Sequence, residues 1–245
     1  MSTATVPPAA PTTPPPARAL REPSDLMDYL GMSPVIVLTG VTWDTYERTL
    51  TRRDAGHRSV RITFDCGSLQ LMTHGNRHER YKALLGRVVS AMCEELGVPM
   101  VLGGNCTIRR EDLDRGFEPD DWFYLGPTAA RMTEATATRA LDFRSDPPPD
   151  LAIEVEITRS LLDRIPLYAA VKIPELWRFD GSRFGIWCLQ PDGTYAPAES
   201  SRYFPTVVAA AINGCLLDLA TLDDAARLRR FREWVRSLPP AAPTT

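Results

Sequence analysis

Lysine is almost missing from this chain of 245 residues, and only Lys82 and Lys172 are present. Arginine therefore supplies nearly all of the fixed positive charge, and the net charge of −3 gives no chain-wide signal for nucleic-acid binding. A local basic groove is still compatible with an acidic chain, so this balance is only a weak argument against a DNA-binding enzyme.

Long apolar runs are also absent, and no stretch is long enough to span a membrane. The N-terminal residues show no charged segment followed by an apolar one, so we expect no secretory signal. The five cysteines are scattered and form no C-x-x-C pair, which favours reduced thiols over a disulfide framework. Together these absences predict a cytoplasmic protein without a membrane partner.

Composition divides the chain into three parts. The N-terminal segment begins with a run rich in proline, alanine and threonine, and the last residues read "PPAAPTT". Such segments cannot bury enough apolar area to offset the entropy of ordering them. We therefore expect disordered tails at residues 1–35 and 239–245, and a single globular domain at 36–238.

Helical and extended patterns alternate irregularly within that domain. Helices are predicted at 43–55 with Thr42 as N-cap, at 76–96 with Gly97 as stop, at 160–171 and at 222–238. A hairpin is predicted at 60–73, and further strands at 98–104, 106–111, 120–126, 150–158, 175–180, 183–190 and 194–198. This mixture predicts an α/β or α+β domain built around one mixed sheet.

Two acids stand one residue apart in the predicted strand "DLAIEVEIT". Strand alternation places Glu154 and Glu156 on one face, about 7 Å apart. Ionised carboxylates on a half-buried strand are costly unless they are paired or bind a metal. With Asp120 from "FEPDDWFYL", they form an all-oxygen ligand set suited to Mg²⁺ or Mn²⁺. The alternative interpretation is a solvated strand face.

The order of these segments resembles the Uma2 (DUF820) family of proposed endonucleases. The resemblance lies in "GFEPDDWFYL" followed by "DPPPDLAIEVEITRSLLDRIPLYAAVKIPELWRFDG", and "HERYKALLGRVVSAMCEELGVP" is similar to the first core helix of that family. It covers roughly residues 37–205. It implies a PD-(D/E)XK restriction-endonuclease-like fold, in which helices flank a mixed sheet.

The resemblance also implies roles for single residues. Asp120 would be the acid of the Pro-Asp motif, and Glu154 the second metal-binding acid. Glu156 stands where related nucleases often carry a lysine, and would hold a water or a second ion. Arg164, four residues before Tyr168, matches a basic position on the family's next helix. Arginine keeps the charge there but cannot act as a base at neutral pH; Lys172 is the alternative cation.

Glu79 completes the candidate catalytic set, because nucleases of this fold often place a glutamate from the first helix near the metal. The competing interpretation is a capping box between Asn76 and Glu79. His74 and His78 have a spacing found at zinc sites. No cysteine or further histidine is nearby in the sequence, and His57 is the only other histidine of the chain. The sequence therefore favours a place for His78 near a phosphate groove over a zinc site.

Two functions follow from these residues. The first is a Mg²⁺- or Mn²⁺-dependent endonuclease that acts on DNA, for which a homodimer would suit cleavage of both strands. The second is a catalytically impaired descendant of the same fold that binds nucleic acid or protein. The missing motif lysine favours this second function, and the sequence does not separate DNA from RNA as the substrate.

Overall fold

The computed structural model describes residues 35–56, 59–104, 106–157, 160–217 and 222–239. The two predicted tails lie almost wholly outside these residues. Within the described part, none of the helices has both the length and the apolar composition needed to cross a bilayer.

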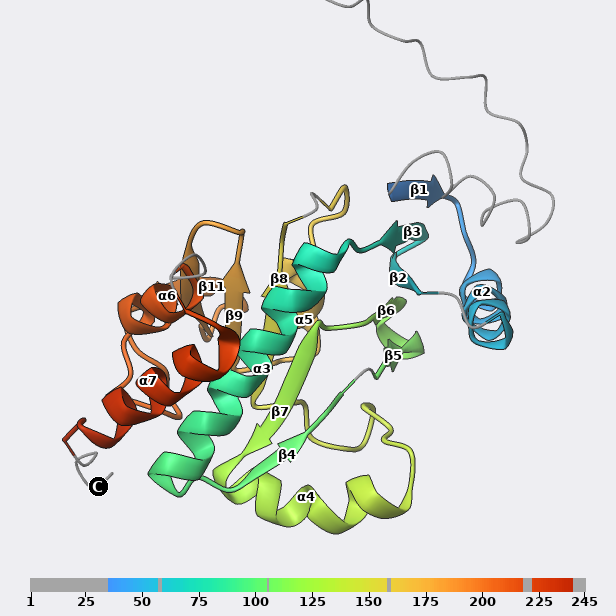
Figure 1. Cartoon of the computed structure of the whole chain (residues 1–245). Coiled ribbons are helices and arrows are strands. Elements are labelled where there is room, and N and C mark those ends of the chain that lie inside the picture. Colours follow the sequence, from blue (N-terminus) through green and yellow to red (C-terminus); the bar gives the residue numbers. More distant parts are fainter. Residues whose placement is uncertain (1–34, 57–58, 105, 158–159, 218–221, 240–245) are drawn as a thin grey trace, which may run out of the picture.

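A six-stranded mixed sheet forms the centre of the fold (Figure 1). Its strands, in spatial order, are β11 (Tyr195–Ala198), β10 (Phe184–Leu189), β9 (Glu175–Phe179), β8 (Leu151–Val155), β7 (Asp121–Leu125) and β4 (Met100–Leu102). Only the pair β8–β9 is parallel, because the chain crosses between these strands through helix α5 (Ile165–Ala170). The predicted fold class, helices around a mixed sheet, is confirmed.

Strand β8 is buried on both faces. Leu151, Ile153 and Val155 belong to the apolar cluster under helix α3 (Asn76–Leu96), and Ala152 belongs to the cluster that contains α5. Glu154 shares the second face and is only 3% exposed. The solvated-face alternative is therefore wrong for Glu154, because the strand is central rather than half-exposed.

Helix α3 follows the amphipathic stripe predicted from the sequence. Its apolar side packs on β8, and α6 (Ala209–Leu217) and α7 (Asp224–Arg236) lie along it (Figure 1). Gly97 ends the helix in the left-handed region, with φ of 66°. On α7, Arg232 and Arg236 form ion pairs with Glu95 of α3, at 3.0 and 2.6 Å, so these two arginines hold the helices together.

A second, antiparallel sheet carries the N-terminal part. Its order is β1 (Val35–Thr39), β3 (Ser68–Thr73), β2 (Val60–Asp65), β6 (Arg115–Phe117) and β5 (Ile108–Arg110). Helix α2 (Trp43–Ala55) covers it with Tyr46 and Leu50, and Thr42 caps that helix as predicted. The predicted β2–β3 hairpin is confirmed, and it lies beside the N-terminal end of α3 (Figure 1).

Some elements carried no usable sequence signal: β1, β6, α6, the short 3₁₀ turn Glu111–Leu113 and α4 (Gly126–Thr138). Helix α4 buries only Ala129 and Met132, so its threonine-rich sequence lacks an apolar stripe. Gly126, expected to close a strand, instead begins this helix with Pro127 in its first turn.

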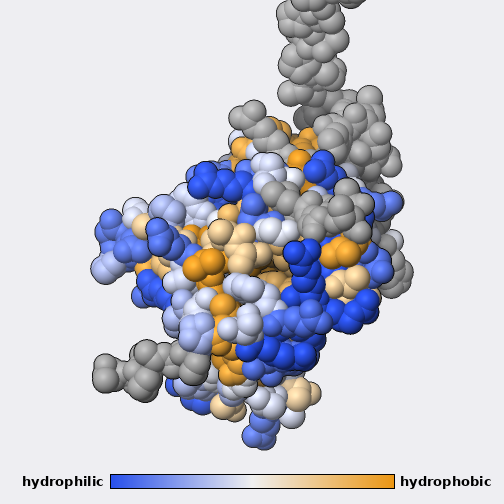
Figure 2. All heavy atoms as spheres, turned by 60° about the vertical axis from the view of Figure 1, so that its left-hand side comes forward, coloured by the Kyte–Doolittle hydropathy of each residue, from blue (hydrophilic) through white to orange (hydrophobic). Residues whose placement is uncertain are grey.

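Hydrophobic residues reach the surface in limited areas. On the face shown in Figure 2, they form an irregular band between hydrophilic residues. The large apolar side chains exposed within the described residues are Leu96, Leu102, Leu161 and Val208.

Gly103 sets the approach of β4 to β7 and gives a test of this packing. Its N–H donates to the carbonyl of Trp122 at 2.8 Å, and a Cβ built on Gly103 would overlap the Trp122 indole. Gly103→Ala is expected to lower the free energy of unfolding by about 1–3 kcal/mol, measured by urea denaturation. Gly214→Ala, in open space on α6, is the matched control and should be neutral or slightly stabilising.

Candidate active site

Two of the predicted acids come together at the junction of β7 and β8. Asp120 immediately precedes β7, and its N–H donates to the carbonyl of Ile153 at 3.1 Å. Glu154 is the next residue of β8. Asp120 is fully buried and Glu154 nearly so. The two acids are 34 residues apart in the sequence, and the antiparallel pairing of β7 and β8 brings them together in one buried site.

Arg61 lies between these carboxylates and was not predicted from the sequence. It comes from β2 of the other sheet, and its side chain is buried. Its Nη2 donates to Oδ1 of Asp120, and its Nη1 lies 3.7 Å from Oε1 of Glu154. A single guanidinium therefore bridges both acids.

Arg164 supplies a second buried cation from the other side. Its Nη1 donates to Oε1 of Glu154 at 2.5 Å, and its Nη2 donates to the carbonyl oxygen of Glu118. Tyr168, one helical turn later, donates its hydroxyl to Oε2 of Glu154. The spacing of four residues across the start of α5 brings Arg164 and Tyr168 to the same carboxylate.

The charges in this cluster are balanced by the protein itself. Burial alone would raise the pKa of Asp120, but Arg61 and His78 outweigh burial and hold it below its usual range. For Glu154, burial is the stronger influence and raises its pKa in spite of Arg164. Two carboxylates thus face two guanidinium groups, and all four side chains are buried.

The donor chemistry suits a hard divalent cation, but the space is taken. Oδ2 of Asp120 accepts from the N–H of Val155 at 2.6 Å, and the other three carboxylate oxygens contact Arg61, Arg164 or Tyr168. A cation bound by both acids needs the volume between them. The site therefore fits Mg²⁺ or Mn²⁺ only if Arg61 moves away.

Glu156 is placed apart from this cluster. It follows the end of β8, and its carboxylate forms an ion pair with Arg178 of β9 at 2.8 Å. The Arg178 guanidinium also lies over the Trp187 ring, 5.2 Å from the centroid. Glu156 therefore has its own cation on the neighbouring strand.

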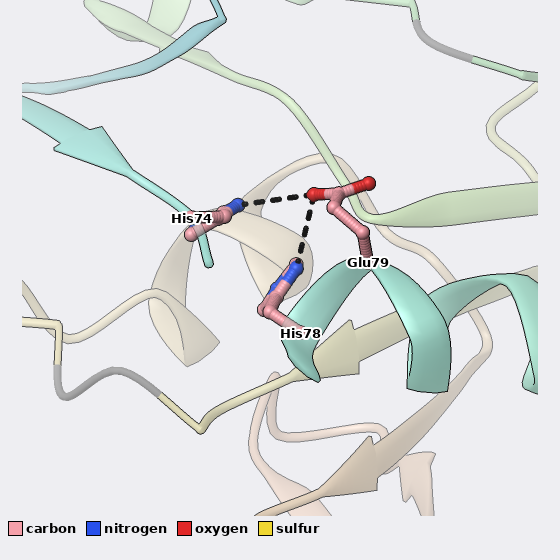
Figure 3. Close-up of side chains that lie close together, drawn as sticks. All are labelled: His74, His78 and Glu79. Carbon is pink, nitrogen blue, oxygen red and sulfur yellow. Dashed lines mark hydrogen bonds and ion pairs between the residues drawn. The ribbon is translucent and has the colours of Figure 1, made fainter. Parts of the chain in front are cut away.

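Glu79 lies in the first turn of α3 (Figure 3). The predicted capping box is wrong, because Gly75 is the N-cap and makes no side-chain capping bond. The Glu79 side chain is 55% exposed, with Oε1 3.2 Å from Nδ1 of His78 and 3.8 Å from Nδ1 of His74. Lys172, the alternative cation, is exposed just after α5.

The two histidines connect Glu79 to the buried acids. Nε2 of His78 lies 3.1 Å from Oδ1 of Asp120. The rings of His74 and His78 are stacked, with centroids 3.7 Å apart. Burial, followed by Arg61 and His78, lowers the pKa of His74 to about 3, so this imidazole is neutral at physiological pH.

A cavity of about 1470 Å³ opens above the cluster. Arg61, His74, Glu79 and Glu118 line it, so the Arg61 side chain stands between the cavity and the acids. Many of the cations that line it have acidic partners, in the pairs Arg53–Glu118, Arg109–Glu47 and Arg144–Asp142. The cavity is broad, and the arginines of these three pairs add no net positive charge to its lining.

Gln70 of β3 fixes the segment that leads to Arg164. Its Oε1 accepts from the backbone N–H groups of Leu161 and Leu162, at 2.9 and 3.0 Å, and its Nε2 donates to the Ser160 hydroxyl. Like Arg61, Gln70 is a polar residue that stands between apolar neighbours on its strand, and both side chains are buried. No local signal could have found them.

A comparison with known families gives a match over most of the chain. The family Uma2, described as "Putative restriction endonuclease", matches residues 43–220. The chain belongs to the Uma2 family. The match includes β2, α3, β7, β8 and α5, and so every residue of the buried cluster. No curated protein matches the chain. For this Uma2 protein, family membership supports a nuclease role in general.

Asp121 provides a test of the electrostatics at this end of β7. Burial raises its folded-state pKa to about 6, whereas its ordinary pKa is 3.8. The folded protein therefore binds more protons than the unfolded chain between these values, and its stability falls as pH rises from about 4 to 6. We expect Asp121→Asn to raise the free energy of unfolding at pH 7.5 by about 1–3 kcal/mol.

The gain should shrink towards pH 4, measured by urea denaturation across this range. Asp44→Asn, at a side chain that is 81% exposed, is the control and should change stability by less than about 0.5 kcal/mol. An Asp121→Asn protein no more stable than wild type at pH 7.5 would contradict the assigned cause.

Proposed function

We propose that this Uma2 protein is a divalent-metal-dependent endonuclease that hydrolyses phosphodiester bonds in DNA. The observation that supports it is the meeting of Asp120, Glu154 and Arg164 in one buried cluster below a wide cavity. Family membership supports the reaction class. DNA as substrate and the identity of the metal are the finer parts of the proposal.

Each residue of the cluster has a role in this proposal. Asp120 and Glu154 would hold Mg²⁺ or Mn²⁺, which supplies an activated water at neutral pH. Arg164 stabilises negative charge on the phosphate, and Tyr168 holds the Glu154 carboxylate in place. Glu79, on α3, lines the cavity and is a further acidic residue of the proposed catalytic set. Glu156 joins it only when its ion pair with Arg178 opens.

Arg61 controls access to the acids. Its guanidinium occupies the space that a shared cation needs, so metal binding exchanges one buried positive charge for another. The exchange keeps the carboxylates compensated, which matters because an unpaired buried charge is costly. The nuclease therefore has an arginine-filled state and a metal-filled state.

Cleavage of supercoiled plasmid tests the nuclease. In Mg²⁺ or Mn²⁺ the wild-type protein is expected to nick the plasmid, and EDTA should stop the reaction. Glu154→Gln removes the charge but keeps oxygen and size, so nicking should fall at least about 100-fold. Glu134→Gln, at an exposed position of α4 outside the cavity lining, is the matched control and should retain full activity. Equal nicking by wild type and Glu154→Gln would exclude Glu154.

A non-catalytic binding module is the second candidate, and the Arg61 bridge favours it. Carboxylates that are fully compensated by arginine need no metal to be stable in the core. In a binding module Arg61 would be a permanent structural cation. A folded wild-type protein that binds DNA but does not nick it in any metal would support this candidate.

Arg61→Met separates the two candidates by stability rather than by activity. Loss of the guanidinium leaves two buried acids with one arginine, so unfolding in EDTA should become easier by about 3–5 kcal/mol. For the nuclease, millimolar Mn²⁺ should raise the melting temperature of Arg61→Met more than that of wild type. Arg236→Met, which breaks an ion pair with Glu95 away from the cluster, is the control and should respond to Mn²⁺ as wild type does. An Arg61→Met protein indifferent to Mn²⁺ would favour the binding module.

The setting and assembly are also proposed. The chain has five cysteines, all free of disulfides, which fits the reducing cytoplasm that we propose as its setting. Cleavage of both strands would be served by a homodimer that presents two such clusters.

A further inference from the structure

His74, His78 and Glu79 form a second cluster beside the buried acids (Figure 3). His74 follows the end of β3, and the other two belong to the first turn of α3. One ligand atom from each lies within 4.8 Å of the others. The hairpin and the helix therefore bring two imidazoles and a carboxylate to one point, although no single element contains all three.

Both nitrogens of His78 face carboxylate oxygens. Nε2 lies 3.1 Å from Asp120 Oδ1, and Nδ1 lies 3.2 Å from Glu79 Oε1. Hydrogen bonds to both oxygens require a ring with two N–H groups, whereas a neutral imidazole carries only one. A metal cation between Nδ1 and Glu79 would take the place of the Nδ1 proton and leave the Nε2 N–H facing Asp120. A ligating imidazole whose other nitrogen faces a carboxylate is the usual arrangement at metal sites.

The Asp120 contact needs a small ring movement to become a good hydrogen bond. The described orientation of the His78 ring leaves Nε2 poorly aligned with Asp120 Oδ1, in spite of the short distance. A slight rotation would align it, and would also turn Nδ1 relative to Glu79. A ligand bound at Nδ1 would hold the His78 ring in this rotated orientation.

His74 is the independent observation. Its side chain is 9% exposed, and its Nε2 is buried without a hydrogen-bond partner among the described residues. Its Nδ1 lies 3.8 Å from the same Glu79 oxygen, which is too far for a hydrogen bond. A metal ion bound at Nδ1 would give this nitrogen the partner that it lacks within the described part of the chain, whereas the buried Nε2 is not part of the ligand set.

We propose that His74 Nδ1, His78 Nδ1 and Glu79 Oε1 bind one transition-metal ion of the Zn²⁺ type. Two imidazoles with one carboxylate favour such ions over Mg²⁺, which prefers oxygen ligands. Around a tetrahedral Zn²⁺ the ligand atoms are about 3.4 Å apart, and the separations of 3.2 and 3.8 Å from Glu79 bracket this value. The fourth position faces the cavity that His74 and Glu79 line.

This site is distinct from the one formed by Asp120 and Glu154. It needs no displacement of Arg61 and does not depend on nuclease activity. His78 contacts both sites, so a bound metal would fix the ring that faces Asp120.

Metal binding without DNA is the direct test. The full-length chain, free of any purification tag, is titrated with Co²⁺, whose visible d–d bands report a tetrahedral nitrogen and oxygen site. One Co²⁺ per chain is expected, displaced by Zn²⁺ but not by excess Mg²⁺. His74→Ala and Glu79→Gln should each weaken Co²⁺ binding at least tenfold. His57→Ala, which removes the chain's only other histidine, should leave it unchanged.

Comparison of the variants distinguishes loss of metal binding from loss of folding and from loss of nuclease activity. Glu79 is largely exposed, so Glu79→Gln should fold even if His74→Ala does not, which circular dichroism would show. Glu154→Gln should still bind Co²⁺, whatever its effect on nicking, and this separates the proposal from the nuclease. No Co²⁺ binding by wild type, or equal binding by the folded Glu79→Gln variant, would overturn it.

Discussion

The neutralisation of two buried carboxylates by two arginines is the constraint on which the rest of the site depends. Asp120 and Glu154 sit where strands β7 and β8 meet, and charged groups cannot remain there without partners. Arg61 comes from one sheet and Arg164 from the segment before α5. Compensation of the acids thus joins the two sheets and the crossover helix, and the site cannot assemble before these parts meet.

This constraint also shapes what the protein can do. In the proposed nuclease, Arg61 and a divalent cation would compete for the same carboxylate oxygens, so occupancy would depend on the difference in free energy between the two bound states. The Arg61 contacts compensate the acids from the chain itself. A metal ion at the acids would have to displace these contacts, whereas one at the proposed site of His74, His78 and Glu79 would not.

The sequence predicted those features that depend on local pattern. The stripe of α3, the β2–β3 hairpin and the apolar face of β8 all follow from periodicity, and these were confirmed. Arg164, noted from the family resemblance as a basic position, lies beside Glu154, and its role towards a phosphate stays a prediction. Arg61 and Gln70 were missed because their partners lie 59 and 90 residues away, and no neighbouring residue signals such a partner.

Periodicity was insufficient at the end of β8. The strand ends at Val155, and Glu156 forms an ion pair with Arg178 of β9 rather than contacting the cluster of Asp120 and Glu154. Asn76 looked like an N-cap because it precedes Glu79 by three residues, whereas the helix takes Gly75. Both cases turn on the end of an element, which tertiary contacts decide more than local sequence does.

The β2–β3 hairpin has a mechanical consequence. Its first strand carries Arg61, its second carries Gln70, which holds the segment before Arg164, and its end leads into His74. One rigid displacement of this hairpin would therefore uncover the acids, release the second arginine and separate the paired imidazoles together. The placement of three chemical groups of the site therefore depends on this one hairpin.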